Sequence, residues 1–201
     1  MPPVRGTRLP AMHGEPAPRS VAGDCNLFFG LFPPPRVREA MARAVEQLRA
    51  TTPVRARWSD PRRYHVTVQF LGRHAQTDPA TLAPLLAAAG TVDAPGFDLQ
   101  LDTTGTFGRG RVGWLGCAAA SPGLHVLWQA LGAALDAQSV DRDRAAAYTP
   151  HVTVLRQARD AWPTRAIEAI GWPVDAFVLA RSPREGGQPY EVLHRWPLRP
   201  A

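Results

Sequence analysis

The chain has 201 residues, enough for one sizeable core or for one domain made of two similar lobes. Its hydrophobic content of 45% is ordinary for a globular protein, and no apolar run is long enough to cross a membrane. The net charge is +6 and all 23 basic residues are arginines, which favours a polyanionic partner unless a general preference for arginine over lysine explains the bias.

Residues 1–23 are rich in proline, arginine and glycine and lack the apolar segment of a signal peptide, so we expect a disordered tail. Residues 24–201 are predicted to form a single domain. Apolar runs and helical spacings alternate through its first half. The predicted elements there are a strand at 26–32, a helix over 37–50, a short strand near 54–58, a strand at 64–71 ended by Gly72, and a helix over 79–89 that Pro84 should kink or shorten.

The second half begins near Gly96 and contains the same kinds of element. Its predicted elements are a strand at 97–101, a hairpin at 105–110, a strand at 111–117, a helix over 122–137, a charged loop at 138–147, a strand at 151–154, and two strands at 172–181 and 190–198 joined by a turn at 182–188. Each half thus combines helices with several strands. This predicts an α+β, bilobal fold of two similar lobes with mostly antiparallel sheets flanked by helices and a catalytic cleft between them.

A short phrase occurs twice in the chain. Residues 64–68 are Tyr-His-Val-Thr-Val, and residues 151–154 are His-Val-Thr-Val. Residues two apart in a strand point to the same side, so each copy puts one imidazole and one hydroxyl on one face. A single histidine on a strand is more often structural than catalytic, but two copies in the same context indicate function. The candidate site residues are His65, Thr67, His151 and Thr153.

These residue types suit chemistry on a phosphodiester. The unperturbed pKa of histidine is about 6.5, so an imidazole can give or take a proton near neutral pH. One histidine would remove a proton from the attacking water, and the other would protonate the departing oxygen. The threonine hydroxyls would hydrogen-bond the phosphate oxygens and hold the phosphorus in line. Such a site needs no metal.

Arg156 follows the second copy at the position that Phe70 holds after the first, and it could neutralise a phosphate. It lies an odd number of residues from His151, so it must sit past the strand end or after a bulge to reach the same face. In the first copy, regular alternation places Gln69 on the face of His65 and Phe70 on the opposite, apolar face.

The paired motif resembles the 2H phosphoesterase superfamily, and more closely the bacterial and archaeal RNA 2′,3′-cyclic phosphodiesterases once called 2′-5′ RNA ligases. The matching segments are 65–72 and 150–156, together with 27–31, Ser182 and 190–193. The resemblance implies metal-independent hydrolysis of RNA 2′,3′-cyclic phosphate ends to 2′-phosphomonoesters, with possible reverse 2′-5′ ligation and no cofactor. It implies a general acid at His65, a general base at His151, and phosphate contacts from Thr67, Thr153 and Arg156.

Other interpretations keep the same residues. The substrate could be a small cyclic phosphate or a 2′,5′-linked oligonucleotide, or the chain could be a non-catalytic module that binds RNA ends. A metal site is the least favoured, because the sequence has no His-x-x-x-His and its two cysteines are isolated. The isolated cysteines predict free thiols and a cytoplasmic location.

The expected partner is RNA with 2′,3′-cyclic phosphate ends, bound by a monomer without membrane contact. Candidates to stack an RNA base are Phe29, Phe107 and Tyr190, although core packing explains Phe29 better. Arg109 and Arg111, next to the predicted hairpin, could contact the RNA backbone or be solvated there.

Overall fold

The computed structural model of the chain describes residues 25–75, 77–108, 111–142, 148–160, 162–182 and 189–200. The predicted tail at 1–23 lies outside these residues, as do parts of the predicted loop at 138–147 and of the predicted turn at 182–188. Within the described residues, no helix combines the length and the apolar character that crossing a membrane requires.

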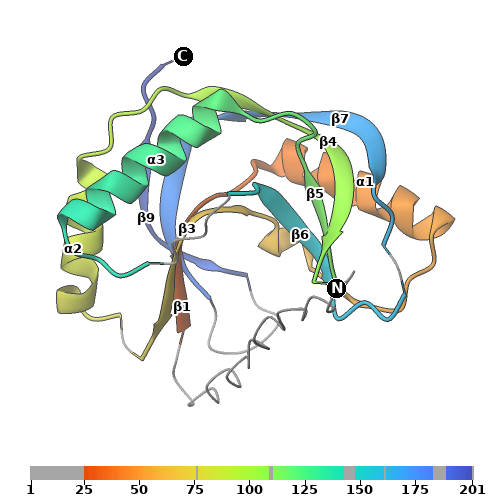
Figure 1. Ribbon diagram of the computed structural model, residues 1–201, viewed down its shortest axis with the longest axis horizontal. Helices are drawn as coiled ribbons and strands as arrows, with labels where there is room; N and C mark the ends of the chain where they lie inside the picture. Colours follow the sequence, from red (N-terminus) through yellow and green to blue (C-terminus); the bar gives the residue numbers. More distant parts are fainter. Residues whose placement is uncertain are drawn as a thin grey trace, which may run out of the picture.

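Helices separate some of the strands along the described chain, and β6 to β9 follow one another without a helix between them (Figure 1). The elements are β1 (Cys25–Leu31), α1 (Pro35–Thr51), β2 (Arg57–Trp58), the 3-10 turn η1 (Pro61–Arg63), β3 (Val66–His74), α2 (Pro79–Gly90), β4 (Phe97–Phe107), β5 (Val112–Gly116), α3 (Pro122–Ala137), β6 (His151–Arg156), β7 (Arg165–Val174), β8 (Ala176–Arg181) and β9 (Glu191–Pro197). The predicted α+β class is confirmed.

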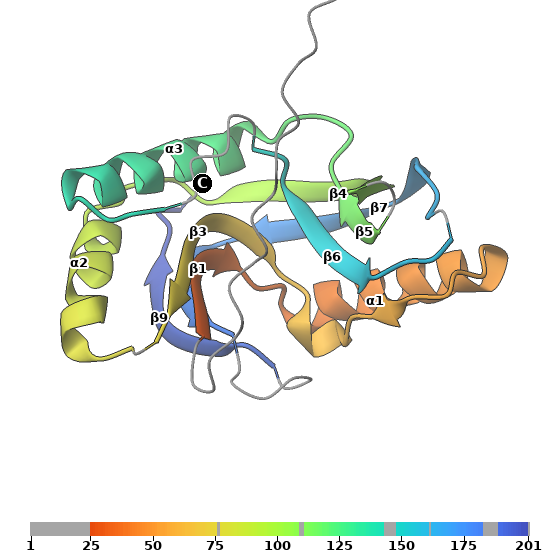
Figure 2. The ribbon, with the colours of Figure 1, turned by 60° about the horizontal axis from the view of Figure 1, so that its bottom comes forward.

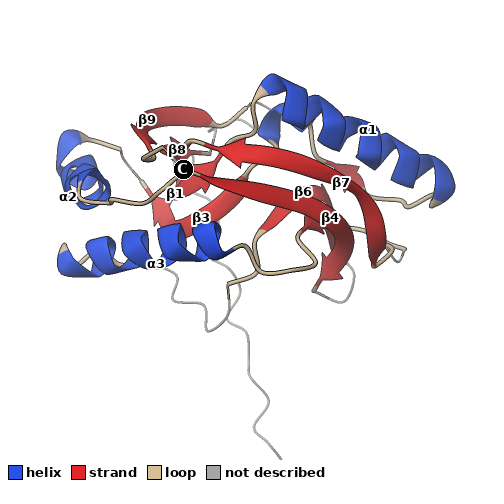
Figure 3. Cartoon of the chain, turned by 90° about the horizontal axis from the view of Figure 1, so that it is seen from above, coloured by secondary structure: helices blue, strands red, loops and turns tan. Residues whose placement is uncertain are grey.

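The strands form one sheet in the order β7-β4-β5-β6-β3-β1-β8-β9, with β2 paired to β6 off this path. All the strand ladders are antiparallel. The two strands that carry the repeated motif, β3 and β6, are therefore neighbours at the middle of the sheet (Figure 3). Along this path, and leaving β2 aside, four of the described strands lie on each side of the junction, counting β3 and β6 themselves. That the two sides of the sheet are similar lobes stays a prediction.

Helices pack on the sheet through the apolar stripes that their sequences predict. The buried side chains of α1 recur at helical spacing, namely Val37, Met41, Val45 and Leu48. Helix α1 lies against β7, whereas α3 lies against β3 and β4 and also contacts α2 (Figure 2). Helix α3 begins where the Ser121 hydroxyl accepts a hydrogen bond from the Leu124 backbone, 3.4 Å away.

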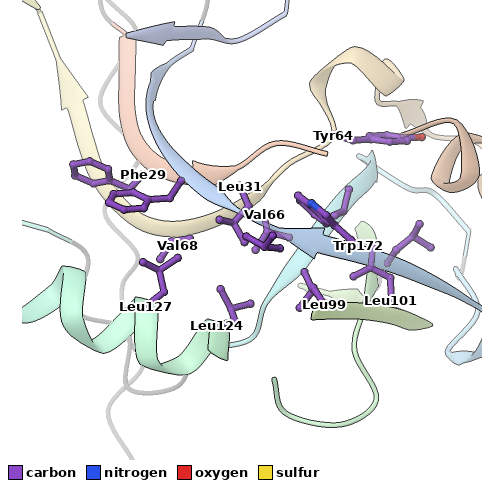
Figure 4. Packing of buried hydrophobic residues seen from close by; sticks show 14 of the residues in the cluster. Phe29, Leu31, Tyr64, Val66, Val68, Leu99, Leu101, Leu124, Leu127 and Trp172 are labelled. Atoms are coloured by element: carbon purple, nitrogen blue, oxygen red, sulfur yellow. The ribbon is translucent and has the colours of Figure 1, made fainter. Parts of the chain in front are cut away.

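One hydrophobic cluster contains residues from the strands on both sides of the β3–β6 junction. Figure 4 shows Leu124 and Leu127 of α3 near Val66 and Val68 of β3, with side chains of β4 and β7 continuing the cluster. Full burial of an aliphatic side chain contributes about 1.5–3 kcal/mol, so the motif valines hold their strands firmly against the helices. The opposite face of β3 and β6 is left for the polar motif side chains.

Several predicted boundaries are wrong. The strand predicted at 172–181 is two strands, because the chain breaks at Asp175. Most of β7 is exposed and only its last residues alternate, so its first half carries no apolar signal. Strand β3 continues past Gly72, which adopts a φ of 85° that favours glycine, and ends at His74. Helix α2 continues through Pro84 to Gly90, and β4 extends to Phe107.

Candidate active site

The two motif strands meet at one residue pair. Val66 of β3 lies opposite Val152 of β6 in antiparallel register. Both valines are fully buried, and the residues on either side of each valine are half-buried on the other face of the sheet. We call this other face the histidine face; it carries His65, Thr67, His151 and Thr153.

The antiparallel register relates the two motifs almost symmetrically. Continued by one residue in each direction, it sets His65 opposite Thr153 and Thr67 opposite His151. Directly opposite residues of an antiparallel pair lie on the same face within side-chain reach of one another. Two imidazoles and two hydroxyls therefore form one diagonal set around the junction.

Each imidazole is held by the backbone in the same way. Nδ1 of His65 lies 2.8 Å from the Arg63 carbonyl oxygen, and Nδ1 of His151 lies 2.8 Å from the Thr149 carbonyl oxygen. A carbonyl can only accept, so each Nδ1 carries the proton and donates. In the neutral ring Nε2 is then the unprotonated nitrogen, ready to take a proton from water or, once protonated, to give one.

Both histidines are shifted toward the neutral form. Burial lowers the pKa of His65 to about 4, and the positive charges of His151, Arg156 and Arg63 act in the same direction, against the opposing hydrogen bond to the Arg63 carbonyl. Burial also lowers the pKa of His151, and the charge of Arg156 adds to this, while the hydrogen bond to the Thr149 carbonyl opposes it. At neutral pH the free protein therefore holds both imidazoles uncharged.

Aromatic rings explain why His65 is so poorly solvated. Its ring centroid lies 4.6 Å from that of Tyr190, 4.9 Å from that of Phe28 and 5.5 Å from that of Phe32. Tyr190, which we predicted as a candidate to stack a base, is half-buried beside the histidine face. Phe29, as expected, is fully buried in the core.

His151 has a different aromatic neighbour. The Phe107 ring meets the His151 ring edge-on at 4.8 Å, and Phe107 stacks on Trp114 at 5.2 Å. The Trp114 indole lies directly over Gly105 and Gly116, where a Cβ would overlap it. The glycines therefore make room for an aromatic platform beside His151, and Phe107 is the second predicted stacking residue found near a histidine.

A bulge in each motif shifts the residues that follow. Val68 in β3 has no partner in the neighbouring strand β1, and Val154 in β6 has none in the neighbouring strand β5. The side chains that follow each of these valines therefore point to the face opposite to the one that regular alternation predicts. The predicted placement of Gln69 on the histidine face and Phe70 on the apolar face is wrong for this reason: Gln69 is buried and Phe70 is exposed. The bulge in β6 turns Arg156 to the histidine face, where its charge acts on both imidazoles.

Gln69 instead belongs to a structural network. Its Nε2 donates to the Trp128 carbonyl oxygen at 2.8 Å, and its Oε1 accepts from Nη1 of Arg142 at 3.2 Å. Arg142 also pairs with Asp136 at 2.9 Å. A buried amide needs partners for both its donor and its acceptor, and these contacts supply both. They also tie β3 to α3 on the core side of the sheet.

Tyr148 is a residue of the site region that the sequence analysis did not assign a role. Its hydroxyl donates to the Thr67 carbonyl oxygen at 2.9 Å, and its ring stacks on Trp128 at 5.3 Å. Pro150, which follows two residues later, has no N–H to offer a neighbouring strand. The hydrogen bond from Tyr148 therefore adds a contact between the segments that carry the two motifs, which are otherwise joined by the short pairing of β3 with β6.

The catalytic cleft predicted between two lobes stays a prediction. A cavity of about 1160 Å³ lies between α1 and β7, and none of the five predicted site residues lines it. Arg109 falls outside the described residues. Across the described parts of the chain, no group of three or more His, Cys, Asp or Glu side chains is placed to hold a metal ion.

His65 and Thr67, at the start of β3, and His151 and Thr153, in β6, form the paired motif by which the chain resembles the 2H phosphoesterases. The model of the 2′-5′ RNA ligase superfamily matches residues 33–186, and the chain belongs to this family. The predicted family resemblance is confirmed, and so is the prediction that the chain is a phosphodiesterase.

Individual relatives agree with this membership. The RNA 2′,3′-cyclic phosphodiesterase of Escherichia coli K12 is 33% identical over 177 residues, which are 86% of this chain and 96% of that protein. The protein of the same name from Geobacillus stearothermophilus is 29% identical over 180 residues, 80% of this chain and 53% of that protein.

Solved structures show the same fold. E. coli LigT complexed with 3′-AMP superposes with a TM-score of 0.73 at 29% identity and covers 87% of this chain and 98% of LigT. TT0787 of Thermus thermophilus has a TM-score of 0.70 at 26% identity, with coverage of 87% and 98%.

Proposed function

We propose that the protein hydrolyses RNA 2′,3′-cyclic phosphate ends to 2′-phosphomonoesters without a metal ion, through His65, Thr67, His151, Thr153 and Arg156. The observation that carries this proposal is the junction of β3 and β6, where two imidazoles with proton-free Nε2 atoms share one face with two hydroxyls. The names of two relatives support the substrate.

His151 acts as the general base and His65 as the general acid. His151 takes a proton from water as the water oxygen bonds to phosphorus, and the bond from phosphorus to the ribose O3′ breaks as His65 gives its proton to O3′. A neutral His151 is ready for the first task. His65 must be protonated beforehand, and the negative charge of a bound phosphodiester favours its protonated form.

The remaining polar groups hold the phosphate. Thr67 and Thr153 lie diagonally across the junction from each other, so their hydroxyls reach the phosphate from two sides. Arg156 supplies a positive charge on the same face for the oxygens that gain charge during the attack. The same groups support 2′-5′ ligation as a side activity when a 5′-hydroxyl takes the place of water: its oxygen bonds to phosphorus as His151 takes its proton, and the bond from phosphorus to O3′ breaks as His65 gives its proton to O3′.

The test is turnover of a short RNA that ends in a 2′,3′-cyclic phosphate, with EDTA present. We expect the wild type to form the 2′-phosphate product, and His65→Ala and His151→Ala to lose about two to four orders of magnitude in rate. His125→Ala, at an exposed position of α3, is the matched control and keeps wild-type activity. Full activity in either site variant would overturn the two-histidine mechanism, and inhibition by EDTA would overturn metal independence.

Two alternatives are outcomes of the same assay. If the folded wild type leaves the RNA intact but hydrolyses a cyclic mononucleotide or a 2′,5′-linked oligonucleotide, the substrate assignment changes and the site does not. Salt-dependent RNA binding without turnover of any of them would make the chain a module that binds RNA ends. The monomeric state and the cytoplasmic location stay predictions.

A further inference from the structure

A second arginine shares the histidine face with Arg156. Strand β2 pairs with β6 so that Arg57 lies directly opposite Arg156 and Trp58 lies opposite Leu155. Trp58 and Leu155 point to the core, where Trp58 meets Trp162 at 5.6 Å. Neighbouring residues of a strand point to opposite faces, so the two arginines lie together on the face that carries the histidines.

This pairing is unfavourable in the free protein. Like charges directly opposite each other on one face of a sheet repel. The two aspartates in the segments 53–64 and 148–160 are already engaged elsewhere: Asp60 pairs with Arg62 at 2.6 Å, and Asp160 with Arg55 at 3.5 Å. In the described part of the chain neither arginine of the opposed pair has a carboxylate partner. A bound anion would remove the repulsion.

We propose that Arg57 binds the phosphodiester on the 5′ side of the terminal nucleotide, and that the protein therefore prefers RNA oligonucleotides to cyclic mononucleotides. This inference rests on the proposed function. Arg156 is the arginine whose charge acts on both imidazoles, so it serves the reacting phosphate. The chain of the substrate ends at that phosphate, so any second phosphate lies on its 5′ side.

The position of Arg57 fits this second phosphate. It lies one strand away from Arg156, about 5 Å at the backbone, and both long side chains are exposed. Two guanidinium groups placed in this way can bind successive phosphates of one strand rather than compete for one. Phosphate contacts of this kind carry no base preference, so the expected selectivity is for length and not for sequence.

The experiment compares two substrates that differ by one internal phosphate. The kcat/KM of adenosine 2′,3′-cyclic phosphate and of an adenylyl dinucleotide ending in a 2′,3′-cyclic phosphate would be measured for the wild type and for Arg57→Gln, Arg57→Lys and Arg55→Gln. Arg55→Gln is the matched control, because it removes the same charge two residues away from a side chain already paired with Asp160.

We expect the wild type to prefer the dinucleotide. Arg57→Gln should lower kcat/KM for the dinucleotide about 10-fold and change that for the mononucleotide by less than about 2-fold. Arg57→Lys should keep part of the preference, and Arg55→Gln all of it. For the dinucleotide, the slope of log kcat/KM against log salt should become shallower by about 0.7 in Arg57→Gln, as expected for one lost phosphate contact on a single strand.

Three results would each overturn the inference. The first is an unchanged rate for the dinucleotide in Arg57→Gln, the second is an equal slowing of both substrates by this change, and the third is the same effect in Arg55→Gln. In each case wild-type turnover of the mononucleotide still supports the two-histidine phosphodiesterase. If the folded wild type turns over neither substrate, the proposed function fails and this inference fails with it.

Discussion

Replacement of His65 by glutamine should make the protein less sensitive to acid. Histidine in an unfolded chain has a pKa of about 6.5, whereas burial lowers the pKa of His65 to about 4. Above about pH 6.5 the imidazole is neutral in both states and the full stability is present. As the pH falls toward 4, the unfolded chain binds a proton that the folded protein excludes, so the free energy of unfolding decreases.

The magnitude follows from the two pKa values. Each pH unit between them costs about 1.4 kcal/mol, so at about pH 5 the wild type should have lost about 2 kcal/mol through His65 alone. Urea unfolding at about pH 7.5 and about pH 5 would measure this loss. His65→Gln should show a loss smaller by about 2 kcal/mol, and the exposed-site variant His125→Gln controls for removal of an imidazole. Equal acid sensitivity of His65→Gln and the wild type would refute the argument that the aromatic rings keep His65 neutral.

Three further predictions concern the surroundings of the histidines. Tyr148→Phe removes the hydrogen bond between the two motifs and should cost about 1 kcal/mol in the free energy of unfolding, and no change in urea unfolding would contradict its role. Gly105→Ala should destabilise by about 1–3 kcal/mol because its Cβ overlaps the Trp114 indole, whereas Gly171→Ala, with open space around it, controls for the loss of glycine. Arg156→Gln should lower kcat/KM by about two orders of magnitude. Because the arginine lowers the pKa of both histidines, its removal should also move the acid limb of the pH–rate profile to higher pH. An acid limb at the wild-type pH would argue against this electrostatic role.

The sequence predicted the elements whose side chains alternate or recur regularly. The apolar spacing over 122–137 gave helix α3 with its observed ends, and the valines around His65 and His151 gave two strands with a buried and a polar face. These patterns arise from packing against the core, so they are visible in a single sequence.

The parts that the sequence did not predict depend on contacts between distant segments. Val68 and Val154 look like ordinary strand residues, and only their pairing partners reveal that they are bulged. The short strand predicted near 54–58 is present as β2, but nothing in its residues indicates that it pairs with β6 and brings Arg57 beside Arg156. The hydrogen bond from Tyr148 to Thr67 spans 81 positions in the chain. A pattern of neighbouring residues in the sequence cannot predict a contact between positions so far apart in the chain.

The strand order has a consequence for synthesis of the chain. Strands β4 to β7 form one side of the sheet from a continuous segment, whereas the other side combines β1 and β3 with β8 and β9, which are translated last among the described strands. Tyr190, just before β9, is also part of the surroundings of His65. A ribosome-bound chain that has exposed both histidines but not β8 and β9 still lacks one of the two strands that pair with β1, so catalytic competence should arise only after β9 has been translated.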